Sequence, residues 1–305
     1  MASRKLITVF GATGAQGGSV ARALLGKPDF AVRAVTRDVK RPSSLALRDL
    51  GATVVQGDLD SEKSVEEVMG GAHGVFLVTN FYEGFSKEKE IRQGKTVADV
   101  AKRLGTKHVV YSGLENVSVV TGGKLEVLHF DGKGEVEQYF WDQGVPVTSV
   151  RIPFYYENFL TIMKPLKVPD SDHYILVLPM GDIPMDGISV ADIGPAVARL
   201  FESPQGFLGK PVGLTAQRLT VKQYAEVLSK HMGKTVMESK ITPDMYAKLG
   251  FPGAKELADM FRYKWMKPYR DIELTRQLNP NVRSFDQFLS ENKKAVKDIL
   301  KVTSL

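Results

Sequence analysis

The sequence predicts an α/β protein built on a Rossmann-type, doubly wound parallel sheet, with a smaller mixed lobe towards the C-terminus. Three observations favour this fold class. Short apolar runs alternate with segments of helical periodicity, a glycine-rich loop follows the first run, and the alternation stops near residue 150. Alternating strands and helices imply parallel strands joined by right-handed crossovers. We therefore expect a sheet domain at 1–152 and a smaller lobe at 153–305.

Six apolar runs mark the expected strands of the sheet. They are nearly continuous, as is typical of strands buried on both faces. The runs are Leu6–Phe10, Ala31–Thr36, Thr53–Gln56, Val75–Thr79, Lys107–Tyr111 and Val147–Arg151. The clearest helix between them places Ile91, Val97, Ala98, Ala101 and Leu104 on one face.

The second half of the chain is broken by prolines into shorter pieces. Helix starts are predicted at Ser189, at Thr220 with Gln223 in a capping-box pattern, and at Thr242-Pro243. No linker or low-complexity tract separates this half from the first. We expect a lobe lying over the carboxyl ends of the strands, where sheets of this class bind their ligands.

The first strand runs into Gly11-Ala12-Thr13-Gly14-Ala15-Gln16-Gly17-Gly18, which then opens a helix. Glycine at such a position lets phosphates approach the backbone N–H groups and the positive end of a helix. The spacing Gly-x-x-Gly-x-x-Gly is one residue off the commonest fingerprint. The order of strand, loop and helix is nevertheless the required one, so the loop predicts a dinucleotide site rather than an ordinary turn.

The end of the second strand indicates which dinucleotide is bound. Arg37 stands twenty residues after Gly17, and Lys40 and Arg41 follow it. Guanidinium groups match the oxygens of a 2′-phosphate, whereas a carboxylate accepts hydrogen bonds from a ribose 2′-hydroxyl. Asp38 could serve as that carboxylate, but three cations against one acid favour NADP over NAD.

The next two strands end in further candidate ligands. Asp58 and Leu59 follow the third strand and could flank the adenine, while Thr79 and Asn80 follow the fourth, on the nicotinamide side. Both pairs lie at the carboxyl ends of strands in the same sheet, which supports their assignment as nucleotide contacts.

The composition excludes some classes of site and makes others less favoured. The 305 residues carry a formal net charge of +6, with basic and acidic residues interleaved, so direct nucleic-acid binding is the less favoured interpretation. The absence of cysteine excludes thiolate metal sites and a cysteine nucleophile. We expect no metal site and no membrane span, and a location in the cytoplasm and also in the nucleus.

Several longer motifs resemble the NmrA-like branch of the atypical short-chain dehydrogenase/reductase superfamily. They are Val9–Val20, Val109–Asn116, His129–Glu135 and Arg151–Asn158. The resemblance implies an NADPH sensor rather than an enzyme, a homodimer, and a regulatory partner, argininosuccinate synthase. It implies NADP(H) contacts at Gly11, Ala12, Thr13, Gly14, Ala15, Gln16, Arg37, Asp38, Lys40, Arg41, Asp58, Leu59, Thr79, Asn80, Phe81, Arg92, Lys133, Tyr155, Tyr156, Glu157 and Asn158. Position 92 departs from the family pattern, because arginine replaces lysine there.

The candidate catalytic set is incomplete. Short-chain reductases usually combine a tyrosine, a lysine four residues later and an orienting serine. Here Lys133 and Ser112 are present, but His129 occupies the place of the tyrosine. The first hypothesis is therefore a non-enzymatic, NADPH-responsive regulator. The second is a reductase of a small carbonyl, quinone or enone that uses Lys133 with His129 or a water. The third is a transcription-linked binding module.

Overall fold

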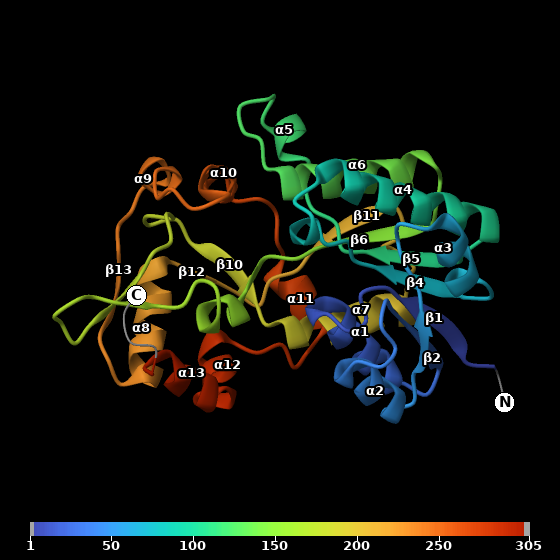
Figure 1. Cartoon of the computed structure of the whole chain (residues 1–305), viewed down its shortest axis with the longest axis horizontal. Helices are drawn as coiled ribbons and strands as arrows, with labels where there is room; N and C mark the ends of the chain where they lie inside the picture. Colours follow the sequence, from blue (N-terminus) through green and yellow to red (C-terminus); the bar gives the residue numbers. More distant parts are fainter. Residues whose placement is uncertain (1–2, 302–305) are drawn as a thin grey trace.

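The computed structural model describes residues 3–301, which form two lobes along the longest axis of the molecule (Figure 1). The larger lobe contains a seven-stranded parallel sheet with the order β11-β6-β5-β4-β1-β2-β3. Its strands are β1 Lys5–Val9, β2 Phe30–Thr36, β3 Thr53–Gln56, β4 Gly74–Leu77, β5 His108–Tyr111, β6 Val147–Arg151 and β11 Lys210–Gly213. The predicted fold class and all six predicted strands are confirmed.

Helices cover both faces of this sheet. On one face α1 packs against α7, and on the other α4 packs against both α3 and α6 (Figure 1). The helices of this lobe are α1 Ala15–Leu25, α2 Pro42–Asp49, α3 Glu62–Met69, α4 Lys87–Leu104, α5 Val117–Val120, α6 Leu128–Asp142 and α7 Val190–Glu202, with the 3₁₀ turn η1 at Phe81–Glu83.

The smaller lobe holds two three-stranded mixed sheets and most of the later helices. The sheet β12-β10-β7 comprises Gln217–Leu219, Met185–Ile188 and Phe154–Tyr155, and the sheet β13-β9-β8 comprises Val236–Glu238, Tyr174–Leu176 and Leu166–Lys167. The helices are η2 Tyr156–Leu160, α8 Val221–Met232, α9 Pro243–Ala247, α10 Ala254–Trp265, α11 Ile272–Leu278, α12 Phe285–Glu291 and α13 Lys293–Ile299. The helix starts predicted at Ser189, Thr220 and Thr242 are all confirmed, the second with its capping box.

The two lobes are interleaved in the chain. The strand β11 pairs in parallel with β6, and α7 packs on α1, although both follow residue 152. Pro211 is tolerated in β11 because this strand lies at the edge of the sheet. A single cluster of buried apolar residues extends from Ile7 in β1 to Phe285 in α12. The division at 1–152 and 153–305 remains a prediction, and its outer ends lie outside the described residues.

The contact between α1 and α7 depends on a glycine. The N–H of Gly194 donates to Ser19 Oγ at 3.0 Å, and this hydroxyl donates to the carbonyl of Ala191 at 3.2 Å. That carbonyl is free because Pro195, one turn later, has no N–H to offer it. A Cβ on Gly194 would lie 2.2 Å from the carbonyl oxygen of Ser19. The helix backbones therefore touch directly.

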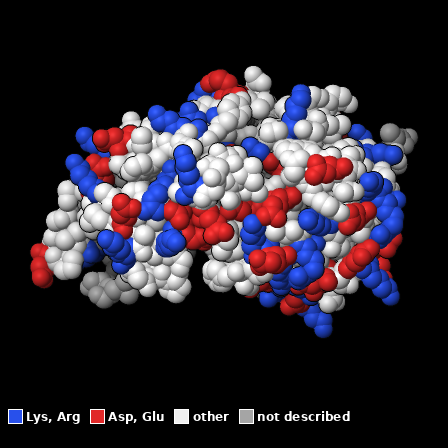
Figure 2. All heavy atoms as spheres, turned by 90° about the horizontal axis from the view of Figure 1, so that it is seen from above, with Lys and Arg blue, Asp and Glu red and all other residues white. Residues whose placement is uncertain are grey.

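Charges are mixed on the face of the molecule that Figure 2 presents. Basic and acidic side chains occur over both lobes there, and acidic side chains gather across the middle of this face (Figure 2). Across residues 3–301, no helix combines the length and the apolar character that crossing a bilayer requires.

We expect Gly194→Ala to lower the free energy of unfolding by about 1–3 kcal/mol, because overpacking at a backbone contact outweighs the higher helix propensity of alanine. The control is Gly26→Ala at the end of α1, where φ is −74° and the new methyl would meet its nearest neighbour at 3.5 Å. This control should be neutral or slightly stabilising. Denaturant unfolding measures both, and equal stability of the two variants would contradict the packing argument.

Candidate functional site

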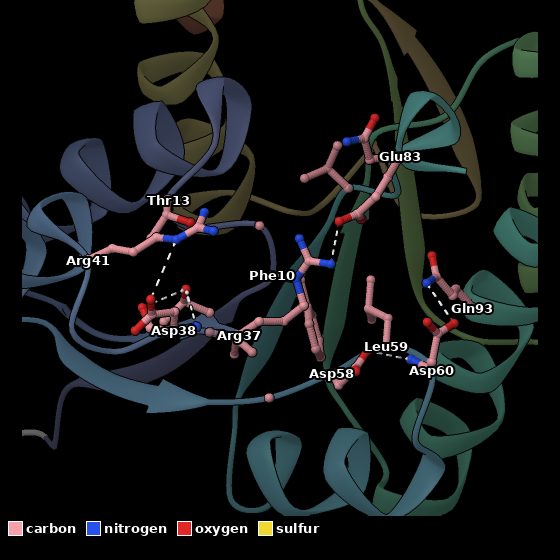
Figure 3. Close-up of a pocket in the computed structure, with 16 residues that line it drawn as sticks. Phe10, Thr13, Arg37, Asp38, Arg41, Asp58, Leu59, Asp60, Glu83 and Gln93 are labelled. Carbon is pink, nitrogen blue, oxygen red and sulfur yellow. Dashed lines mark hydrogen bonds and ion pairs between the residues drawn. The ribbon is translucent and has the colours of Figure 1, made fainter. Parts of the chain in front are cut away.

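A groove opens at the carboxyl ends of β1, β2, β3 and β4 (Figure 3). Its volume is about 130 Å³. Eight residues with predicted nucleotide contacts line it: Gly11, Thr13, Arg37, Asp38, Arg41, Asp58, Leu59 and Asn80. The structure thus brings together the ends of strands that are far apart in the sequence.

The glycine loop is shaped by two close contacts. Gly11 has a left-handed φ of +61°, and a Cβ there would lie 2.9 Å from Val78. A Cβ on Gly17 would lie 2.2 Å from the carbonyl oxygen of Gly11, so α1 starts directly against the loop. Gly14 caps the helix with no side-chain hydrogen bond, and its first turn carries no acid. The N–H groups of this turn are therefore available to an anion.

The basic side chains of the groove are held by carboxylates. Arg37 forms an ion pair with Glu83 of η1, across the groove from β2 (Figure 3). Arg41 Nε lies 3.7 Å from Asp38 Oδ2. All four side chains are more than a third exposed, so these pairs contribute little stability and can be exchanged for a ligand.

Asp60 and Gln93 also line the groove, and no pattern in the sequence predicts either residue. Gln93 Nε2 donates to Asp60 Oδ1 at 2.9 Å, and Lys89 Nζ lies 3.0 Å from Oδ2. Burial alone would raise the pKa of Asp60, but Lys89 and Gln93 lower it below its usual value. Arg92 does not line the groove, and it lies 3.7 Å from Asp60.

Lys133 is fixed in a buried ion pair behind the groove. Its Nζ lies 2.7 Å from Glu90 Oε1 and donates to the hydroxyl and carbonyl oxygens of Thr79 at 2.9 and 3.0 Å. The Lys133 and Glu90 side chains are only 12% and 1% exposed. Removing one partner of such a pair costs about 3–5 kcal/mol, because the other charge is left buried and alone.

His129 lies one helical turn before Lys133 and bridges the lobes. Its Nδ1 lies 2.7 Å from Glu256 Oε1, in the first turn of α10, and its backbone N–H donates to the same oxygen. Burial would raise the pKa of Glu256, but the hydrogen bonds and charge of His129 lower it below its usual value. The carboxylate therefore fixes the orientation of the imidazole.

A second cavity, of about 420 Å³, lies between this corner and α10. The predicted residues Gln16, Ser112, His129, Lys133, Tyr155 and Asn158 line it. The Tyr155 hydroxyl accepts a hydrogen bond from Gln16 Nε2, and burial raises its pKa to about 12. This phenol stays neutral near pH 7, so it does not replace the missing low-pKa tyrosine.

Other predicted side chains lie outside both cavities. Lys40 is exposed, Thr79 binds Lys133, and Phe81 packs against His129. Tyr156 is fully buried in an aromatic cluster with Phe159, Tyr224, Phe285 and Phe288. Glu157 accepts hydrogen bonds from Ser189 Oγ and Val190 N–H at the start of α7. Ala12, Gly14 and Ala15 lie on the glycine loop or at the start of α1. No cluster of three metal-binding side chains occurs within residues 3–301.

Several residues of the site lie outside the predictions made from the sequence. Glu90 had a usable signal, because it continues the buried face of α4 four residues before Gly94 and seven before Val97. Glu83, Glu256 and Lys264 had none, since their partners or cavities are formed by segments distant in the sequence.

The chain is similar to several curated proteins. An NmrA-like family domain-containing protein of Dictyostelium discoideum is 35% identical over 80% of this chain and 83% of its own length. An NmrA-like family domain-containing oxidoreductase of Aspergillus campestris is 30% identical over 86% of this chain and 83% of its own length. NmrA-like family domain-containing protein 1 of Rattus norvegicus is 28% identical over 95% of this chain and 96% of its own length.

The fold is similar to that of a solved protein, NmrA, a negative transcriptional regulator. Its complex with NADP superposes with a TM-score of 0.83 and 25% sequence identity, covering 99% of both chains. NmrA has also been solved with NAD. The model of the NmrA-like family matches residues 3–289, nearly the whole length described above. The chain belongs to the NmrA-like family.

Proposed function

We propose that this protein is an NADP(H)-binding regulator, a redox sensor whose association with a partner or with a second copy depends on the bound nucleotide. The observation that carries the proposal is the groove where the glycine loop, the uncapped start of α1 and two arginines converge. A 2′-phosphate is the nucleotide group that such arginines recognise. The NADP complex of NmrA and its description as a transcriptional regulator support this proposal.

The ion pair between Arg37 and Glu83 offers a route from nucleotide to surface. A 2′-phosphate carries more charge than a carboxylate and takes up the guanidinium of Arg37, which releases Glu83. Glu83 belongs to η1, next to the exposed aromatic side chains of Tyr82 and Phe85, 52% and 70% exposed. NADH lacks the 2′-phosphate and leaves the pair in place. Nucleotides with and without the 2′-phosphate therefore favour different states of this segment. This is the differential affinity that a sensor of NADP(H) occupancy needs, and the response to the oxidation state of the nicotinamide has to come from the other end of the nucleotide.

The partners are part of the proposal. A homodimer and argininosuccinate synthase, which the family resemblance implies, are the associations to test in the cytoplasm and nucleus. The exposed aromatic residues Tyr82, within η1, and Phe85, just after it, offer these partners a surface whose conformation would follow the nucleotide.

NADPH, and not NADH at equal occupancy, should speed amide hydrogen exchange at Glu83–Phe85, because it frees the carboxylate that ties η1 to β2. Hydrogen-exchange mass spectrometry of the full chain measures this. Capture of argininosuccinate synthase and the mass in solution, each measured with either nucleotide and with none, give the functional outcome. Identical exchange and association in all three states would overturn the sensor.

Two variants test the route itself. Arg37→Met should weaken NADPH binding about 10- to 100-fold and leave NADH binding within about twofold, since it removes a charged hydrogen bond to the 2′-phosphate. Glu83→Gln should strengthen NADPH binding by about two- to fivefold, because an exposed ion pair no longer competes. Glu67→Gln, an exposed glutamate paired with Lys63 on α3, is the matched control.

A second candidate function is an NADPH-dependent reductase of a small carbonyl, quinone or enone. The specific observation in its favour is the 420 Å³ cavity, which has Ser112, Lys133 and His129 in its wall. Lys133 would hold the nicotinamide ribose or the substrate oxygen, and the imidazole that Glu256 orients would supply a proton. The name of the Aspergillus relative, an oxidoreductase, supports this candidate.

If the protein is a reductase, mixing NADPH-loaded protein with a panel of quinones, aldehydes and enones should discharge the nicotinamide absorbance in a single turnover. Lys133→Met should abolish this signal, but it also leaves Glu90 buried without a partner. The double variant Lys133→Met/Glu90→Gln removes that charge, so its stability should recover while activity stays lost. Recovery of activity in the double variant would show that Lys133 does no chemistry.

A further inference from the structure

The larger cavity is bounded on the side away from the nucleotide groove by one helix of the small lobe. Leu257, Met260 and Lys264 of α10 line it, at the spacing of residues that share a helix face. Most of the remaining wall is apolar or aromatic and includes Phe130, Phe154 and Tyr155. Such a wall favours a flat, largely apolar ligand.

The charges at this cavity are of one sign. Within residues 3–301, the lining contains two lysines and a histidine but no aspartate or glutamate. Lys133 is neutralised by Glu90, and His129 is hydrogen-bonded to Glu256. Lys264 differs from both, because no described residue forms a hydrogen bond or an ion pair with its ammonium group.

The carboxylates nearest to Lys264 already have partners. Asp186 accepts from Arg218 Nε at 3.0 Å, and Glu115 accepts from Arg270 Nη1 at 2.6 Å. Burial, together with the positive charge of Arg270, lowers the pKa of Lys264 to about 8, and the negative charges of Asp186 and Glu115 offset this shift only in part. A half-buried ammonium group without a counter-ion costs free energy that an incoming anion recovers.

We propose that this cavity binds a small aromatic carboxylate, with its acid group on Lys264 and its ring between the aromatic walls. The opposite end of such a ligand reaches towards Ser112 and Lys133. The inference rests on the proposed function only because that function places the nucleotide beside the Ser112 end of the ligand. It adds the class of ligand that the larger cavity binds. The proposed contacts are the same whether the ligand is a substrate or a molecule that inhibits association with a partner or a second copy.

The test uses 2-naphthoate and its neutral counterpart 2-naphthamide as probes, with calorimetric titration of the full-length protein. Wild-type protein should bind 2-naphthoate about tenfold or more tightly than 2-naphthamide, the difference that a charge-assisted hydrogen bond supplies. Lys264→Met should lower the affinity for 2-naphthoate to that for 2-naphthamide. Lys264→Arg should keep the preference for 2-naphthoate over 2-naphthamide. Lys255→Met, an exposed lysine of the same helix, is the matched control and should bind like wild type.

Three outcomes would overturn the proposal: no binding of either probe, equal binding of both by wild type, or an unchanged preference in Lys264→Met. The last would place the anion on Lys133 or His129. Lys264→Met should unfold no more readily than wild type, because it removes an unpaired charge. NADPH affinity is measured separately and should be unaffected by this variant. If wild-type protein does not bind NADPH, the proposed function is refuted, but the conclusion drawn from 2-naphthoate is unaffected.

Discussion

The structure depends on backbone contacts that only glycine permits. Gly17 lets the start of α1 lie against the carbonyl of Gly11, and Gly194 lets α7 lie against Ser19 of the same helix. The first contact aims the free N–H groups of α1 at the groove. The second attaches a helix from the second half of the chain to the half that carries the glycine loop. One helix, α1, therefore positions the groove and holds a helix from the second half of the chain, and a single methyl group at either glycine would force it to move.

The sheet was predictable because its strands are buried on both faces. Such strands appear as apolar runs without reference to distant residues, and β3 and β6 have the predicted bounds. Capping patterns were equally local, as at Thr220. The edge strand β11 could not be predicted, since it is short and contains Pro211, and only its neighbour β6 makes it a strand. The strands of the small sheets in the second lobe are also short, and they could not be predicted for the same reason.

Some residues of the candidate site could be predicted from local sequence, and others depend on distant segments. Glycines and polar residues at strand ends could be placed from the sequence, because the topology brings the carboxyl ends of parallel strands to one edge. The partners of the charged residues could not be placed. Glu83, Glu90 and Glu256 each pair with a group of the site from another element, and Tyr156 shares its motif with Tyr155 but points into the core. These pairings explain why Lys264 is distinctive: it is the cavity lysine with which no residue of the described part of the chain forms an ion pair.

The interleaving of the lobes has a consequence for how this protein can be divided or recombined. A fragment ending at residue 152 would lack β11, and β6 would become the open edge of the sheet. Four of the five residues of β6 are buried in the whole protein. An exposed edge of this kind pairs readily with other chains and leads to aggregation. The first half of the chain is thus not a portable module, and gene fusion or domain shuffling at this boundary would separate a strand from the sheet that it protects.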